Sequence, residues 1–271
     1  MNCPRACAAP SSAARLRTRA EPTPVWRAAW RLARALVHLL AGLLTILLRF
    51  PRLSPEQREL RVQVWSRELL ARLGIRLQVV GEATRPGPLL LVANHLSWLD
   101  ITALHAARFC RFVSKADVAR WPLIGALASG VGTLFIERES RRDARRVVHH
   151  MADSLRAGQV LAVFPEGTTG DGVALLPFHA NLLQAAIAAD APVQPVALQF
   201  IETHSGQRSA APNYVGADTL VGSVWRTVRA PDITVRIVFG VPQAAAGRER
   251  RAWAADLRQA IEALRQPPAS G

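Results

Sequence analysis

The sequence predicts an α/β fold in which a mainly parallel sheet is flanked by helices and preceded by an N-terminal two-helix element. Three observations lead to this prediction. From Ile75 onward, short apolar runs alternate with amphipathic stretches, which is the pattern of parallel strands connected by helices. Before Ile75, two long helical patterns follow one another with arginines at their ends. Polar side chains recur directly after several apolar runs, and the carboxyl ends of parallel strands are where such sheets bind ligands.

The net charge of +14 on 271 residues is concentrated near the N-terminus. Residues 1–76 hold 14 Arg against four Glu, whereas residues 77–271 carry a net charge of only +4. Arginine beside long apolar helices favours an anionic lipid surface as the partner. No zinc-finger, RNP or basic-zipper pattern is present, so the composition argues against nucleic acid. Three cysteines make no disulfide framework, which favours a reducing compartment.

Residues 1–23 are rich in Ala, Arg, Pro and Ser without periodicity, and we expect a disordered basic tail. Val25 to Phe50 is predicted to form one helix. Its uncharged centre, Ala35 to Leu48, has 14 residues and spans about 21 Å, which is shorter than a hydrocarbon core of about 30 Å. Arginines precede and follow this centre, so charge selects no orientation. We expect partial, monotopic insertion, with a single membrane span and a core helix of a soluble domain as alternatives.

A second helix is predicted to begin after Ser54, which is a good N-cap. Pro55 suits its first position and Gln57 its third, and Gly74 suits its end. Apolar residues recur along one face of this helix among charged ones. Residues 24–75 are therefore expected to form a membrane-binding helical pair.

The rest of the chain is predicted to comprise one strand–helix domain, residues 76–245, and a C-terminal helix and tail, residues 246–271. The predicted strands are Ile75–Val80, Leu89–Ala93, Phe109–Val113, Thr133–Ile136, Val160–Phe164, Val193–Phe200 and Ile233–Phe239. The predicted helices are Leu99–Ala107, Arg141–Ala157, Leu176–Ala189, Thr219–Val228 and Arg248–Arg265.

The stretch from Pro88 to Asp100 joins a buried strand to a helix through a polar turn. On one continuous helix, the offset between His95 and Asp100 would rotate their side chains apart by roughly 140°. A strand ending at Ala93 and a helix capped by Ser97, with Asp100 as the acidic partner of a capping box, change the backbone direction between them. The carboxylate then holds the imidazole, which is how a general base is oriented. The alternative is that Asp100 only caps the helix and His95 is an ordinary loop residue.

Further polar residues follow other predicted strands. Lys115 and Arg138 each come after a strand, and the two cations suit an anionic headgroup. Glu166 is a candidate acceptor for a substrate hydroxyl, while Gly167 and Thr168 offer backbone N–H groups on a tight turn. The alternatives are solvated surface charges and a plain Pro-Glu-Gly turn.

No metal ligand set is predicted, because the His95–Asp100 spacing is not a usual one for metal ligands. His149 and His150 fall on the polar face of an amphipathic helix. No Gly-x-Ser-x-Gly motif occurs, so a covalent intermediate on serine is not favoured. Ser97 is the only hydroxyl near His95, and we expect it to cap the helix instead.

With these motifs in place, the sequence resembles the glycerolipid acyltransferases typified by lysophosphatidic acid acyltransferase. Four blocks of that family have counterparts here, in order and at suitable separations: Asn94–Asp100, Gly132–Arg138, Phe164–Thr168 and Val193–Leu198. The resemblance covers about residues 76–200, and the two N-terminal helices are similar to the membrane-binding element of the family. Four blocks in order are a far more specific signal than any one of them.

The resemblance implies that residues 76–245 form an acyltransferase domain with His95 and Asp100 as the catalytic pair. It also implies that Arg138 contacts the acceptor headgroup, that Glu166, Gly167 and Thr168 bind its glycerol part, and that Lys115 contacts phosphate.

The implied reaction moves a fatty acyl chain from a thioester, acyl-CoA or acyl-carrier protein, to the free hydroxyl of a lysolipid. The expected acceptor is 1-acylglycerol-3-phosphate, which would give phosphatidic acid in phospholipid biosynthesis. No cofactor is expected, membrane lipids are the expected partners, and the expected location is the cytoplasmic face of the inner membrane.

Two departures from the family keep other acceptors open. Thr169 and Gly170 stand where a basic residue often follows the third block, and the segment from Asn213 to Arg226 resembles relatives that acylate lyso-ornithine lipid. Acylation of lyso-ornithine lipid or of another lysophospholipid is therefore the enzymatic alternative. A basic, non-catalytic membrane-binding protein on the same scaffold is the non-enzymatic one.

Overall fold

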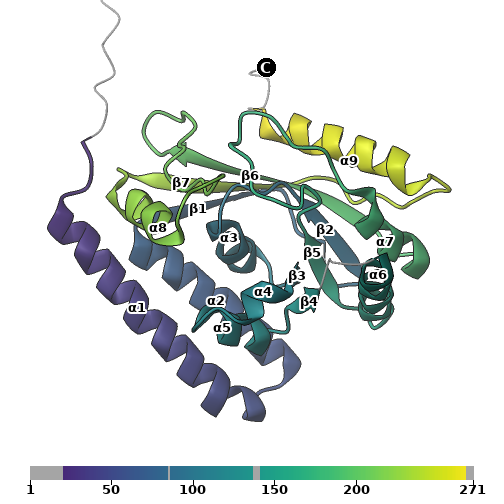
Figure 1. Ribbon diagram of the computed structural model, residues 1–271, viewed down its shortest axis with the longest axis horizontal. Helices are drawn as coiled ribbons and strands as arrows, with labels where there is room; N and C mark the ends of the chain where they lie inside the picture. The colour runs from purple at the N-terminus through teal and green to yellow at the C-terminus, as the bar shows by residue number, and fades with distance from the viewer. Residues whose placement is uncertain (1–20, 85, 137–140, 267–271) are drawn as a thin grey trace, which may run out of the picture.

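Seven strands form one mixed sheet in the computed structural model, which describes residues 21–84, 86–136 and 141–266 (Figure 1). Across the sheet the order is β1-β7-β6-β2-β5-β3-β4. The strands are β1 Ile75–Val80, β2 Leu89–Ala93, β3 Arg111–Lys115, β4 Leu134–Ile136, β5 Val160–Val163, β6 Val193–Glu202 and β7 Ile233–Phe239.

Strand β2 lies inside the sheet and runs parallel to both of its neighbours, with Leu90 aligned with Leu161 of β5 and with Val193 of β6. Strands β5, β3 and β4 continue the parallel part. Strand β7 is antiparallel to β6, and β1 is parallel to β7, so these two strands run against the other five. The predicted fold, a mainly parallel sheet flanked by helices, is confirmed.

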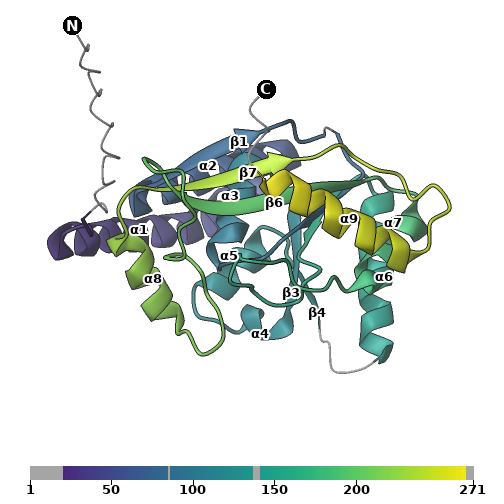
Figure 2. The ribbon, with the colours of Figure 1, turned by 90° about the horizontal axis from the view of Figure 1, so that it is seen from above.

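Alternating side chains along β2 divide the core into two layers, as expected for a strand buried on both faces. Leu89, Leu91 and Ala93 pack toward one helical layer, and Leu90 and Val92 toward the other. The first layer contains α1 Val25–Leu48, α2 Pro55–Leu73, α3 Leu99–Ala107 and α8 Leu220–Arg229. The second contains α6 Arg141–Arg156, α7 Leu183–Ala189 and α9 Arg250–Arg265, and Figures 1 and 2 show the sheet between the two layers.

The two N-terminal helices are fastened together near their middles. The Nε2 atom of His38 in α1 lies 3.0 Å from the carbonyl oxygen of Trp65 in α2, and the indole N–H of Trp65 donates back to the carbonyl oxygen of His38 at 3.2 Å. The two rings also stack, with centroids 5.0 Å apart. Gly42 permits this approach, because a Cβ atom there would stand 2.5 Å from the indole nitrogen.

Much of the remaining surface of α1 is apolar and exposed. This exposed set comprises Val25, Trp26, Trp30, Leu36, Val37, Leu40, Leu44, Leu47 and Leu48. Helix α1 is long and apolar enough to cross a membrane, and 17% of its most apolar window is buried in the protein. Helix α2 starts as predicted, with a capping box made by Ser54 and Gln57, and Gly74 ends it in the left-handed conformation.

The predicted helix Leu176–Ala189 forms only in its second half, as a 3₁₀ turn, Ala180–Leu182, followed by α7. The first half is held in a non-helical path because the N–H groups of Leu176 and His179 donate to residues of the turn after β5. Tertiary hydrogen bonds therefore override the apolar pattern of this stretch.

Two short helices, α4 Ala116–Ala119 and α5 Ile124–Gly130, were absent from the sequence prediction. Pro122 separates them, and neither is long enough to show helical periodicity. Residues 21–23 are the only part of the predicted basic tail that the structure describes, and there Thr23 donates its N–H to the carbonyl oxygen of Arg229 at 2.8 Å.

Candidate active site

The turn between β2 and α3 brings the imidazole of His95 against the carboxylate of Asp100. The Nδ1 atom of His95 lies 2.8 Å from Oδ2 of Asp100. The same oxygen accepts the backbone N–H groups of Leu96, at 2.6 Å, and of Ser97, at 2.8 Å. Because Oδ2 acts as an acceptor toward all three, Nδ1 carries the hydrogen and Nε2 keeps its lone pair. The turn thus presents one basic nitrogen, and the pair lies together as the sequence predicted.

The two side chains of this pair differ in how far they are buried. The side chain of Asp100 is fully buried, whereas that of His95 is 20% exposed. Asp100 stands in the first turn of α3 and accepts the N–H of Ser97, but the N-cap of α3 is Trp98, without a side-chain cap hydrogen bond, so Ser97 is not the N-cap that the sequence predicted. The hydroxyl of Ser97 accepts the N–H of Leu99 at 3.2 Å and donates to the carbonyl oxygen of Pro212 at 2.5 Å. Ser97 is therefore engaged in holding the turn.

Glu166 reaches the same turn from the end of the neighbouring strand β5. Its Oε1 accepts the N–H of His95 at 2.8 Å, and its Oε2 accepts the N–H of Leu176 at 2.9 Å. Burial raises the pKa of Glu166, and these two N–H groups partly oppose that effect. Glu166 is only 5% exposed and holds the backbone of the His95 turn in place. The predicted contact with a substrate hydroxyl would use a further lone pair of this carboxylate, and it stays a prediction.

Aromatic rings support the other side of His95. The imidazole stacks on Phe164, with centroids 4.0 Å apart and an angle of 8° between the planes. Phe164 in turn stacks on Phe112 of β3 at 5.7 Å. Asn94, fully buried, exchanges hydrogen bonds of 3.0 and 2.8 Å with the carbonyl oxygen and the N–H of Leu198 in β6. Residues of β3 and β6 and the residue that follows β5 thus fix the position of the imidazole.

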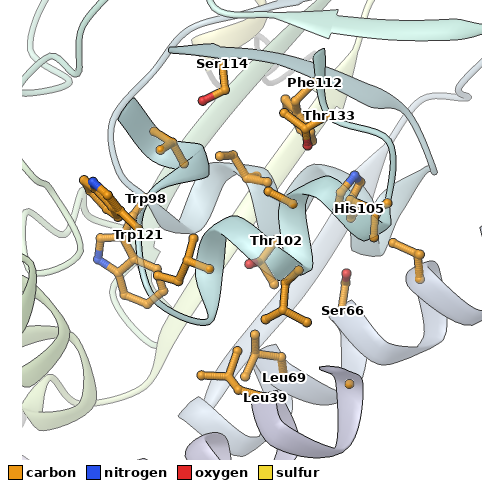
Figure 3. A pocket seen from close by; sticks show the side chains of 18 of the residues that line it. Leu39, Ser66, Leu69, Trp98, Thr102, His105, Phe112, Ser114, Trp121 and Thr133 are labelled. Atoms are coloured by element: carbon orange, nitrogen blue, oxygen red, sulfur yellow. The ribbon is translucent and has the colours of Figure 1, made fainter. Parts of the chain in front are cut away.

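His95 opens onto an apolar cavity of about 800 Å³ between the sheet and the N-terminal helices. Helices α1, α2 and α3, the α4–α5 segment and α8 line the cavity together with strand residues, the turn after β5 and Tyr214. Figure 3 shows the polar side chains of Ser66, Thr102 and His105 among apolar ones on its wall. A cavity of this size and character suits an alkyl chain.

The remaining predicted site residues have different outcomes. Gly167 and Thr168 line the cavity together with His95, and Gly167 adopts a φ of 71°, which glycine tolerates without strain. Lys115 is the last residue of β3, at the same edge of the sheet as His95, and the structure describes its backbone but not its side chain. Arg138 lies outside the described residues.

The segment between β6 and β7 also forms part of this site, although no sequence motif predicted it there. The N–H of Tyr214 donates to the carbonyl oxygen of Leu96 at 3.0 Å, and Tyr214 lines the cavity. The hydroxyl of Thr169 donates to the carbonyl oxygen of Tyr214. The only signal in the sequence was a faint resemblance of residues 213–226 to certain relatives, because a contact over such a separation leaves no local pattern.

Across the part of the chain that the structure describes, no group of three or more His, Cys, Asp and Glu side chains is arranged to hold a metal ion. The described residues of the site offer an imidazole with its orienting carboxylate, backbone N–H groups and an apolar cavity.

Comparisons with known proteins point to one family. A family model described as Acyltransferase matches residues 76–199. The 1-acyl-sn-glycerol-3-phosphate acyltransferase of Neisseria meningitidis is 38% identical over 214 residues, which cover 78% of this chain and 82% of that protein. The lyso-ornithine lipid O-acyltransferase of Pseudomonas aeruginosa is 40% identical over 197 residues, which cover 73% of this chain and 75% of that protein.

The fold also has a counterpart among solved structures. The crystal structure of the 1-acyl-sn-glycerophosphate (LPA) acyltransferase from Thermotoga maritima matches with a TM-score of 0.62 and 16% identity. The match covers 90% of this chain and 97% of that one. At this identity the likeness supports the fold, including the helices before the sheet.

Proposed function

The chain belongs to the acyltransferase family that includes 1-acyl-sn-glycerol-3-phosphate acyltransferases, and from this premise we propose which residues carry the reaction and which acceptor it uses. The reaction class is acyl transfer to a lysolipid. The observation that carries the proposal is the His95–Asp100 pair, whose Nδ1 and Oδ2 atoms are 2.8 Å apart and whose imidazole lines an apolar cavity.

His95 acts as the general base. Its Nε2 takes the proton of the acceptor hydroxyl while the hydroxyl oxygen attacks the carbonyl carbon of the acyl thioester. When the tetrahedral intermediate collapses, the carbon–sulfur bond breaks and the protonated His95 returns the proton to the leaving thiolate. Asp100 holds the imidazole in the required tautomer and stabilises its charged form. No external cofactor enters these steps.

The turn after β5 is proposed to stabilise the oxyanion. Within the described residues, the backbone N–H groups of Thr168 and Thr169 donate to no protein acceptor. Both residues line the cavity beside His95. Free N–H groups next to the attacked carbonyl are the usual means of stabilising a tetrahedral oxyanion.

The apolar cavity is proposed to hold the acyl chain, and α1 is proposed to lie along the membrane surface. Arg31 of α1 donates to the carbonyl oxygen of Val228 in α8 at 3.0 Å, and His38 is fastened to α2. Near the other end of α1, Ile46 contacts the position of Gly130 in α5. A helix held to the domain at several points along its length cannot cross a bilayer without losing these contacts, which favours monotopic insertion from the cytoplasmic face of the inner membrane.

The proposed acceptor is 1-acylglycerol-3-phosphate, and the proposed donor is acyl-CoA or acyl-carrier protein. Lys115 ends β3 at the edge of the sheet where His95 lies, and Arg138 follows β4 closely in the sequence. Two cations suit a phosphate dianion better than the carboxylate and ammonium of lyso-ornithine lipid. The identity of about 40% to a lyso-ornithine lipid acyltransferase makes that lipid the second candidate acceptor.

The test presents the full chain in detergent with labelled acyl-CoA or acyl-carrier protein and with each lysolipid side by side. We expect the highest kcat/KM with 1-acylglycerol-3-phosphate. Asp100→Asn is expected to lower kcat by about 10²–10⁴-fold with every accepted lysolipid, because the imidazole loses its orienting anion. A preference for lyso-ornithine lipid would reject the acceptor assignment. Normal turnover by Asp100→Asn would reject the mechanism.

A further inference from the structure

A segment outside the matched acyltransferase region forms part of the catalytic turn. The family model ends at residue 199, whereas residues 209–229, between β6 and β7, lie against the turn that carries His95. Three hydrogen bonds join them. The N–H of Tyr214 donates to the carbonyl oxygen of Leu96 at 3.0 Å, and the hydroxyl of Ser97 donates to the carbonyl oxygen of Pro212 at 2.5 Å. The indole N–H of Trp98 donates to the hydroxyl of Ser223 at 3.2 Å. Three consecutive residues after His95 are thus held by this segment.

The segment is itself well held. Arg226 of α8 donates to the carbonyl oxygen of Asn213 at 2.7 Å and pairs with Asp218 at 2.9 Å. The side-chain amide of Asn213, 8% exposed, donates to the carbonyl oxygen of Asp171 at 2.6 Å. A loop with this many side-chain to backbone hydrogen bonds presents its residues in one arrangement, which is what a recognition element requires.

Within this segment, Tyr214, Leu220 and Val224 line the cavity, and Tyr214 is the polar one of the three. It is half-buried and lines the cavity with His95, Thr168 and Thr169. Its backbone is fixed on both sides, by the N–H donated to Leu96 and by the carbonyl oxygen that accepts from Thr169. Its phenol hydroxyl has no hydrogen-bond partner among the described residues, and it is the only tyrosine of the chain.

We propose that Tyr214 is a specificity-determining residue, whose phenol donates a hydrogen bond to an anionic oxygen of the acceptor headgroup. This inference rests on the proposed function, because it needs a lysolipid whose free hydroxyl lies at His95. For 1-acylglycerol-3-phosphate the oxygen belongs to the phosphate, and for lyso-ornithine lipid it would belong to the carboxylate. We assign the phosphate, in line with the acceptor proposed above.

The chemistry of the position supports a headgroup contact. The cavity is mainly apolar, and a phenol hydroxyl on its lining is poorly matched to an alkyl chain. A phenol donates one hydrogen bond, and bonds to charged oxygens are stronger than neutral ones. Because the donor comes from the segment between β6 and β7, variation there can alter acceptor choice while the catalytic pair stays the same.

The test compares Tyr214→Phe with the unchanged chain, using three acceptors: 1-acylglycerol-3-phosphate, lyso-ornithine lipid and uncharged 1-acylglycerol. Removing only the hydroxyl should raise the KM for the phosphate acceptor about tenfold to a hundredfold, with kcat and the KM for the acyl donor little changed. The uncharged acceptor should lose nothing. The matched control is Val215→Ala, which changes an exposed neighbour outside the cavity lining and should leave all three acceptors unaffected.

Each outcome decides the proposal. An equal loss with all three acceptors, or no loss with any, overturns it, and a loss confined to lyso-ornithine lipid overturns the assignment of the phosphate. If Tyr214→Phe has a lowered melting temperature, its KM values are measured below the temperature at which it unfolds. A folding defect would lower the activity with all three acceptors alike, whereas the proposed contact affects the phosphate acceptor. The experiment separates this inference from the proposed function. If the unchanged chain acylates no lysolipid, the proposed function is refuted, whereas the inference about Tyr214 is decided by the variant alone.

Discussion

His95 and His105 are two partly or fully enclosed histidines on the same cavity wall, and they have opposite chemistry. They are linked through rings, since His95 stacks on Phe164, Phe164 on Phe112, and Phe112 meets the edge of His105 at 5.0 Å. His95 bonds a carboxylate, whereas Nε2 of His105 lies 2.9 Å from the carbonyl oxygen of Cys110. The partner and the exposure of each ring, rather than residue type, separate a proposed base from a structural histidine.

Burial dominates the behaviour of His105. It lowers the pKa of His105 from 6.5 to about 4, and the bond to the carbonyl of Cys110 offsets only part of this effect. His105 is 6% exposed and stays neutral at pH 7. His95 instead has the carboxylate of Asp100 at 2.8 Å, an arrangement that suits its proposed role as general base.

The largest expected effect comes from replacing each of the two histidines in turn. His95→Ala is expected to lower kcat by about 10²–10⁴-fold, because the variant lacks the imidazole that is proposed to take the proton of the acceptor hydroxyl. His105→Phe keeps the volume and aromatic contacts of the ring and should retain kcat within severalfold. Both variants are assayed with the preferred lysolipid and labelled acyl donor. If the two substitutions lower kcat equally, the comparison fails.

A second test uses the pH dependence of stability. Since the pKa of His105 is lower in the folded chain than in the unfolded one, its contribution to stability is complete above pH 6.5 and is lost as the pH falls toward 4. The whole shift corresponds to about 3 kcal/mol. Denaturant unfolding in detergent at pH 7 and pH 5 should show a smaller decline for His105→Phe than for the unchanged chain. Parallel pH profiles would assign the acid sensitivity to other groups.

The smallest expected effect comes from Arg258, which reaches the backbone of His95 only through a chain of hydrogen bonds. Arg258 of α9 donates to the carbonyl oxygens of Leu175, at 2.7 Å, and Leu176, at 3.3 Å. The N–H of Leu176 then holds Glu166, which holds the N–H of His95.

Arg258→Ala should therefore lower kcat about three- to tenfold through a displaced Glu166, in line with the loss of about 1 kcal/mol of positioning energy. Arg251→Ala, on the exposed side of the same helix, is the matched control and should leave kcat unchanged. Partial recovery by Arg258→Lys would support positioning, because lysine can still reach one carbonyl. A change in KM for either substrate without a change in kcat would contradict this role.

The sequence predicted the local parts of the site well. The strand before His95 and the helix that carries Asp100 follow from residues within one short stretch, and both have the predicted bounds. The proximity of Glu166 to His95 follows from parallel pairing of β2 with β5, which aligns their carboxyl ends. The strand and the helix depend on side-chain periodicity, which acts between near neighbours in the chain, whereas the contact between Glu166 and His95 spans 71 residues.

Other features depend on contacts that leave no local signal. Pro212 accepts from Ser97 across 115 residues, and Tyr214 reaches the cavity by the same long-range approach. The stretch from Leu176 to His179 has an apolar pattern typical of a helix, yet its N–H groups are captured by Pro165 and Glu166.

The amino-acid sequence by itself determined the strand–turn–helix that carries His95 and Asp100, because the periodicity of apolar side chains is a property of short segments. The tertiary structure alone decided that Glu166 supports the backbone of His95, that Tyr214 faces the cavity, and that α1 lies along the domain. Hydrogen-bonding groups buried by packing must find partners, and which partners they find depends on how distant segments come together.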